Sequence, residues 1–133
     1  MPTFLKLYAV ALPTFLVVDL IWLGLVARGF YRAQLGHLMR PEVNWAAATA
    51  FYVVFVAGIV ILAVWPAVER ESLGRALALG ALLGLVAYAA YDLTNLSTLR
   101  DFPLTLAVVD LAWGTFLCAT VSGITYLVWT HLA

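Results

Sequence analysis

The sequence predicts an all-α integral membrane protein in which four transmembrane helices form an antiparallel bundle. Two observations lead to this fold class. First, 65% of the 133 residues are hydrophobic and 11% are charged, with a mean hydropathy of +1.04, whereas soluble domains carry about 25% charged residues. Second, four apolar stretches are each long enough to cross the hydrocarbon core, which takes about 20 residues of helix. The polar residues are too few to cover a soluble particle, so apolar side chains must face lipid.

The four stretches cover residues 4–27, 45–68, 75–99 and 103–132, and they make residues 1–133 a single transmembrane domain. Each should be helical, because backbone groups in lipid find hydrogen-bond partners only within the protein. The first stretch is longer than the apolar part of a secretory signal, about 7–15 residues, so we expect it to be a retained helix. The connections at 69–74 and 100–102 are tight and therefore join antiparallel neighbours.

The longer connection, residues 28–44, has an amphipathic pattern. Its apolar residues recur at roughly helical spacing and face away from three arginines: Phe30, Tyr31, Leu35, Leu38 and Met39 lie opposite Arg28, Arg32 and Arg40. This pattern favours a short helix lying in the membrane interface. A solvated loop with a few apolar residues is the alternative.

Small residues recur every four positions in the last two stretches: Ala76, Gly80 and Gly84 in one, and Gly114, Cys118 and Ser122 in the other. Such stripes let helix backbones approach closely. They predict helix–helix contacts, either within the bundle or between copies of a homo-oligomer. We expect Cys118 to pack as a small apolar residue.

The distribution of basic residues gives the orientation. Four arginines lie on the side of the first and third connections, three of them in the long one, whereas Lys6, Arg70, Arg75 and the terminal amine lie on the other side. The positive-inside rule therefore favours a cytoplasmic location for residues 28–44 and 100–102.

Three of the seven acidic residues lie inside the apolar stretches: Asp19, Asp92 and Asp110. Asp19 comes nine residues before the first connection, Asp92 eight before Arg100, and Asp110 seven after the fourth stretch begins. Because helix directions alternate, all three should lie roughly 10–14 Å below the same membrane face. A carboxylate in hydrocarbon costs about 2.5–3.5 kcal/mol on insertion scales, so these side chains should turn inward. The topology therefore predicts one shared acidic site.

The neighbours of the aspartates suggest a pocket for an amphiphile. Two tryptophans share a helix face with an aspartate at i, i+3 spacing and lie deeper than an interfacial belt. Two arginines could reach in from the surface. We predict a ligand-binding site composed of Asp19, Trp22, Tyr88, Asp92, Asn95, Asp110, Trp113, Arg28 and Arg100. The alternative is that each aspartate makes a hydrogen bond between helices that fixes the bundle.

Several function classes have no support in the sequence. The two histidines lie on opposite faces and there is one cysteine, so no metal-ligand spacing exists. We find no phosphate loop, nucleophile elbow or dinucleotide fingerprint, so we expect no cofactor and identify no catalytic residue. His37 is either a proton carrier or a solvated loop residue. The formal net charge is zero, which gives no reason to expect nucleic acid; membrane lipids are the expected partners.

Two strings share the pattern Asp-Leu-x-Trp, residues 19–22 and 110–113, and a third reads Tyr-Asp-Leu-Thr-Asn-Leu at residues 91–96. Together with residues 30–38 and with Trp-Pro-Ala at 65–67, they resemble a family of small bacterial membrane proteins known as domain of unknown function 2177. The resemblance covers nearly the whole chain. It implies four helices and a bacterial inner-membrane location, and it implies no activity.

Three functions are consistent with these residues. The first is binding or modification of a lipid-like amphiphile in the acidic and aromatic pocket. The second is proton or ion translocation through the aspartates. The third is a structural or accessory role in a membrane complex, with the small-residue stripes as docking faces. The residues leave open whether the protein is an enzyme.

Overall fold

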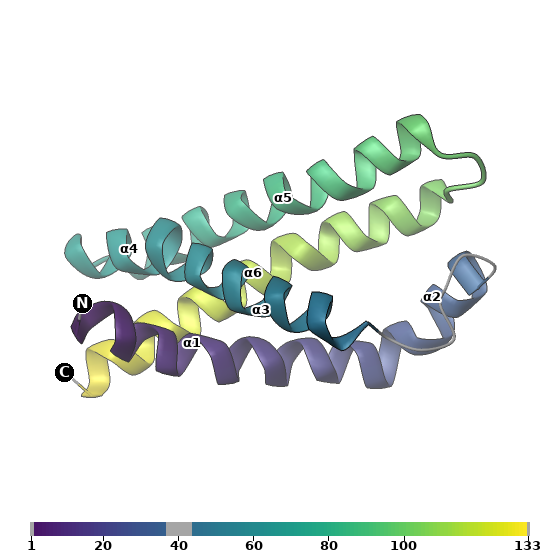
Figure 1. The fold of residues 1–133 in the computed structure, drawn as a ribbon. Coiled ribbons are helices and arrows are strands. Elements are labelled where there is room, and N and C mark those ends of the chain that lie inside the picture. The colour runs from purple at the N-terminus through teal and green to yellow at the C-terminus, as the bar shows by residue number, and fades with distance from the viewer. Residues whose placement is uncertain (1, 37–43, 133) are drawn as a thin grey trace.

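The computed structural model describes residues 2–36 and 44–132. In this part of the chain every long element is helical, and four helical rods are long and apolar enough to cross a membrane. The rods run antiparallel, so that both termini lie at one end and residues 28–35 and the 99–103 connection lie at the other (Figure 1). The predicted four-helix transmembrane fold is confirmed.

Two of the rods change helical geometry along their length. The first is α1 (Pro2–Ile21), which continues through Pro13 and then widens into the π-helical segment η1 (Trp22–Ala27). The second consists of α3 (Trp45–Ile59), the π-helical η3 (Val60–Val64) and α4 (Trp65–Glu69). The other rods are the uninterrupted helices α5 (Leu73–Thr98) and α6 (Leu104–Leu132).

Side-chain caps set the first residue of two rods. The Asn44 side chain accepts a hydrogen bond from the Ala47 backbone N–H at 3.1 Å, and Ser72 Oγ accepts one from the Arg75 N–H at 3.0 Å. Each cap satisfies a backbone donor that the first turn of a helix leaves free. The helices therefore begin where the sequence supplies a short polar side chain.

The long connection contains a short helix, α2 (Arg28–Leu35), which confirms a helix in this segment. Its apolar residues Phe30, Tyr31 and Leu35 pack against Phe102 and Leu106, at the start of α6. The apolar face of α2 is therefore directed towards the bundle, and α2 covers one end of it. The predicted continuation through Leu38 and Met39 lies outside the described residues, as do His37 and Arg40.

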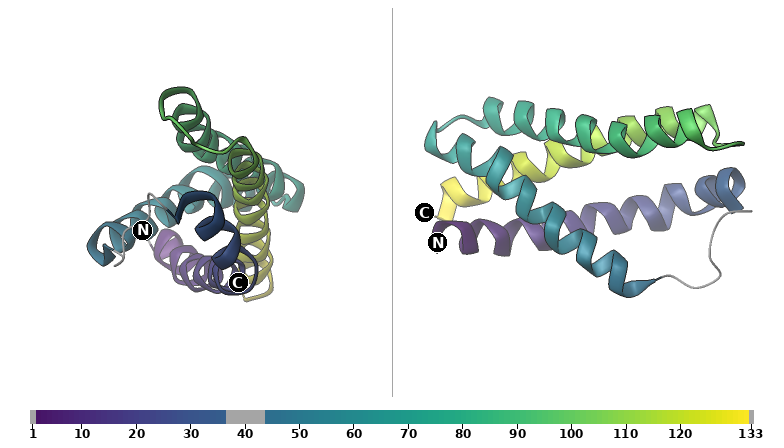
Figure 2. Two further views of the ribbon diagram at one scale, coloured as in Figure 1. Left: turned by 90° about the vertical axis from the view of Figure 1, so that its right-hand side faces the viewer. Right: turned by 45° about the horizontal axis from the view of Figure 1, so that its top comes forward.

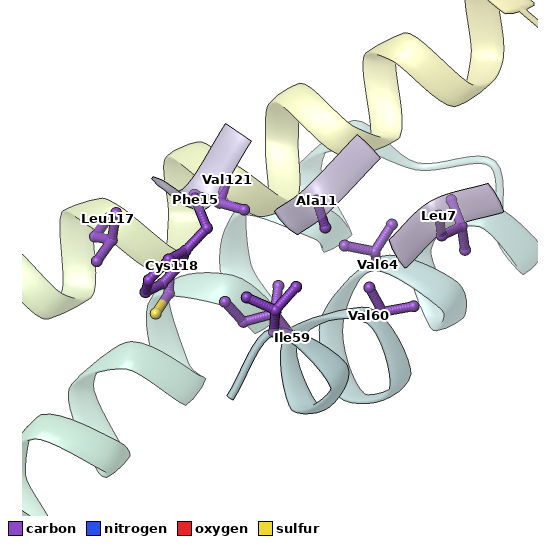
Figure 3. Packing of buried hydrophobic residues seen from close by; sticks show 10 residues of the cluster. Leu7, Ala11, Phe15, Ile59, Val60, Val64, Leu117, Cys118 and Val121 are labelled. Carbon is purple, nitrogen blue, oxygen red and sulfur yellow. The ribbon is translucent and has the colours of Figure 1, made fainter. Parts of the chain in front are cut away.

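The half of the bundle nearest the termini has a tightly packed apolar core. Leu7, Ala11 and Phe15 of α1 meet residues of the second rod and of α6, all fully buried: Val56, Ile59, Val60, Val64, Leu117, Cys118 and Val121 (Figure 3). Cys118 is one of these buried residues, in keeping with a packing role. No ionisable carboxyl or basic side chain belongs to this described cluster.

The small-residue stripes lie where α5 and α6 meet. A Cβ added to Gly84 would meet the Gly114 carbonyl, and one added to Gly80 would lie 2.6 Å from the Cys118 carbonyl oxygen. The two backbones are thus close enough to exclude larger side chains. These stripes are buried within one chain, so a homo-oligomer, which stays a prediction, would have to use other faces.

The α5–α6 contact generates a stability prediction. We expect Gly84→Ala to lower the free energy of unfolding by about 1–3 kcal/mol, because the added methyl group meets backbone that cannot move aside locally. Gly58→Ala is the matched control, since a Cβ there has nothing within 4 Å, and it should leave stability unchanged or slightly raised. Denaturant titration in detergent measures the free energy of unfolding of both purified variants. An equal change in the two variants would contradict the close contact of α5 and α6.

Candidate functional site

A cavity of about 470 Å³ lies in the half of the bundle that is farther from the termini. The ribbons of α3 and α5 separate towards this end (Figures 1 and 2), and α2 lies across it. All four rods and α2 contribute to the lining. Six of the residues predicted from the sequence line this cavity: Asp19, Trp22, Tyr88, Asp92, Asp110 and Trp113.

Helical spacing accounts for these placements. Asp19, Trp22 and Leu23 stand at i, i+3 and i+4 at the junction of α1 and η1, so they share one face. Leu106 and Asp110 stand one turn apart on α6, and Trp113 stands one further turn along. The three aspartates come from three helices and reach one cavity because the helices alternate in direction.

Two of the aspartates accept hydrogen bonds from tyrosines on other elements. Tyr52 of α3 donates to Asp19 Oδ2 at 2.9 Å, and Tyr31 of α2 donates to Asp110 Oδ1 at 2.5 Å. Burial and the hydrogen bond to Asp110 raise the pKa of Tyr31 above its ordinary value, so the phenol stays a donor. These bonds attach α3 and α2 to the acidic face of the cavity.

Asp92 differs from the other two aspartates. Its side chain is 0% exposed, and neither carboxyl oxygen has a hydrogen-bond partner among the described residues. The Asp110 carboxyl lies beside it and offers no donor when both acids are ionised. A buried carboxyl without a donor is costly, so this group indicates that the cavity receives something that pairs with it.

The two tryptophans form a stacked pair. The Trp22 and Trp113 rings lie 4.3 Å apart between centroids with an interplanar angle of 8°. Both indole nitrogens are buried and have no acceptor among the described residues. The pair therefore joins η1 to α6 and leaves two N–H donors beside the aspartates.

The other predicted site residues do not reach the cavity. Among the described side chains, Asn95 and Arg100 are absent from its lining, and Arg100 is exposed in the turn after α5. Arg28 begins α2, and its side chain lies outside the described part of the structure. Arg32 lines the cavity instead and is the only cation among its described lining residues.

Several lining residues were not predicted as part of the site: Leu23, Tyr31, Arg32, Leu35, Tyr52, Tyr91 and Leu106. The depth of Tyr52 in the membrane could have indicated its place in the site. The second and fourth stretches begin at the same membrane face, and Tyr52 lies seven residues into the second just as Asp110 lies seven residues into the fourth. Tyr31, Arg32 and Leu35 carry no such signal. Their position depends on how α2 folds back, which the spacing of apolar residues does not determine.

Comparison with known proteins identifies the family. The family model described as "Predicted membrane protein (DUF2177)" matches residues 4–127. The chain belongs to this family. The match extends over all four rods and every described residue that lines the cavity. No curated protein and no solved structure matches the chain.

Membership establishes a DUF2177 membrane protein and assigns no activity. Function therefore has to be inferred from the cavity itself. The cavity combines three carboxyl groups, one guanidinium at its edge, two free indole donors and several phenols.

The stacked indoles generate a spectroscopic prediction. Two indoles in this geometry couple electronically, so we expect an exciton couplet in the far-ultraviolet circular dichroism spectrum. Trp22→Phe and Trp113→Phe should each abolish it, whereas Trp129→Phe, near the C-terminus, should leave it intact. A couplet that survives either substitution in the pair would contradict the stacked arrangement.

Proposed function

We propose that this DUF2177 protein binds a lipid-like amphiphile in the cavity, with the polar end of the ligand among Asp19, Asp92 and Asp110 and its apolar chain directed towards the surrounding lipid. Trp22 and Trp113 would form one wall, Tyr88 would contribute a hydroxyl group, and Arg32 would contact the ligand near the membrane surface.

The observation that carries the proposal is the unpaired carboxyl of Asp92. It is fully buried, faces a cavity and lacks a donor among the described residues. Leaving a buried polar group unpaired costs about 1–3 kcal/mol, and more when it is charged. A ligand that supplies a donor or a positive charge would remove this cost.

The amphiphilic character follows from the way the cavity meets the outer surface. Tyr91 and Leu23 line the cavity and are also 55% and 40% exposed. Both lie on apolar rods, where the outer surface faces lipid. At these exposed lining residues a chain could leave the cavity sideways into the bilayer while the polar end stays inside. The ribbons of α3 and α5 also separate at this end (Figure 2).

The two alternative functions have less support. Translocation through the aspartates needs a polar path across the whole bilayer, yet the described core below the cavity contains no carboxyl or basic side chain, and its buried polar side chains are the hydroxyls of Ser122 and Thr125 (Figure 3). A docking role for the small-residue stripes is weakened because they are buried between α5 and α6. If the ligand is chemically modified, the three carboxyl groups are the candidate acids and bases.

We also propose that the protein resides in a bacterial inner membrane with the cavity end on the cytoplasmic side, as the excess of arginine in residues 28–44 indicates. Glu71 and Asp101 are matched positions for a test, because both lie in exposed turns with positive φ, at opposite ends of the molecule. In intact cells an impermeant maleimide should label Glu71→Cys and spare Asp101→Cys. The reverse pattern would contradict the orientation.

Lipid binding is tested by cross-linking with a phospholipid that carries a photoreactive group on its chain. We expect cross-links at residues of the cavity and at its exposed lining residue Tyr91, and we expect Leu23→Trp to reduce them several-fold by filling the cavity. Leu25→Trp is the matched control, because Leu25 lies two residues away, is 80% exposed and does not line the cavity.

Two results would overturn the proposal. One is a uniform distribution of cross-links around the apolar surface of the protein. The other is an equal yield from the Leu23→Trp and Leu25→Trp variants when both remain folded, as judged by their thermal transitions.

A further inference from the structure

We infer that the polar end of the ligand is a cation, an amine or quaternary ammonium group, which lies against the carboxyls of Asp92 and Asp110 and the aromatic walls. This inference rests on the proposed function and specifies the chemical class of the ligand.

The balance of charges is the first reason. Three carboxyl groups line the cavity, and Arg32 is the only described cation that lines it. Arg32 is an exposed residue of α2, whereas Asp92 and Asp110 are 0% and 8% exposed. The interior of the cavity is therefore acidic and its compensating charge is peripheral, which favours a positively charged ligand.

The position of Asp92 is the second reason. Asp92 has no donor among the described residues, and its carboxyl neighbours that of Asp110, which accepts one hydrogen bond from Tyr31. Two carboxylates in apolar surroundings repel each other strongly. A cation beside the pair would add an attraction to each carboxylate and so offset this repulsion.

The aromatic lining is the third reason. Four tyrosines and two tryptophans contribute to the wall, so their rings surround the acidic groups. Faces of aromatic rings attract cations, and combinations of acidic and aromatic side chains bind alkylammonium groups. An anionic headgroup would be repelled by the ring faces and would face three carboxyl groups, which the indole N–H donors alone would not offset.

The spacing of the acids argues for an organic cation over a metal ion. In the described part of the chain, no group of three acidic, histidine or cysteine side chains is arranged to hold one metal ion. The cavity of about 470 Å³ has room for a substituted ammonium group and the first carbons of a chain.

The test uses the full-length protein in maltoside micelles and three probes with the same decyl chain: decyltrimethylammonium, decyl maltoside and decyl sulfate. Binding is followed by tryptophan fluorescence, to which five tryptophans contribute, among them Trp22 and Trp113 of the cavity wall. The variant is Asp92→Asn, which keeps the shape and removes the charge. Asp101→Asn is the matched control, because it makes the same change in an exposed turn at the same end of the molecule.

We expect decyltrimethylammonium to bind the wild type and Asp101→Asn equally and to bind Asp92→Asn on the order of tenfold more weakly, as the loss of one buried charge pair implies. The maltoside and sulfate probes should show no such difference between variants. Asp110→Asn, which removes the charge and keeps an amide oxygen that can accept the Tyr31 hydrogen bond, should weaken binding of the cationic probe as well and serves as the second variant if Asp92→Asn fails to fold.

Two contrary results are distinguishable. In the first, all three probes bind, compete with one another and lose affinity in the Leu23→Trp variant, but the affinity of the cationic probe is unchanged in Asp92→Asn and Asp110→Asn. The cavity then binds amphiphiles, and the inference of a cationic headgroup is wrong. In the second, Leu23→Trp changes the affinity of none of the three probes. The cavity is then not a binding site, and both the inference and the proposed function fail.

Discussion

An ionisable side chain inside a bilayer must find its partner within the molecule or in a ligand, because lipid offers none. Asp92 shows this constraint in its simplest form: a carboxyl with 0% exposure and no donor among the described residues. Its position is set by the close contact of α5 and α6. The Tyr88 ring lies against Gly114, and one turn beyond them on their respective helices stand Asp92 and Asp110. The small residues that bring two backbones together thus also bring two acids together.

The two halves of the bundle solve different packing problems. Near the termini, aliphatic and small side chains such as Ala11, Val60 and Val121 fill the space between the rods, and no carboxyl or basic side chain belongs to the described cluster. In the other half, tyrosines and tryptophans hold the rods apart, and α3 and α5 separate (Figure 2). The polar parts of these aromatic residues are used to position the acids, as Tyr52 does for Asp19 and Tyr31 for Asp110. A rigid apolar half therefore supports a half that contains a cavity.

The sequence was sufficient for the fold and for the deepest part of the cavity. Apolar length and tight connections determine four antiparallel rods, and the rods in turn bring Asp19, Asp92 and Asp110 to one end. The periphery was harder to predict. Asn95 has suitable chemistry and depth, but the azimuth of its side chain about α5 depends on how the helices pack, which spacing along one helix does not give. Arg100 lies in the exposed turn after α5 and does not reach back to the cavity. Arg32 and Tyr31 line the cavity because α2 packs on Phe102 and Leu106, a tertiary contact between distant segments.

The most direct measurement of the central claim is an experimental structure of the protein purified with its native lipids retained. The account predicts density for the polar end of an amphiphile within hydrogen-bond distance of the Asp92 carboxyl, continuing as a chain between α3 and α5. A closed, dry bundle in which Asp92 is bonded to a group of the protein itself would contradict it.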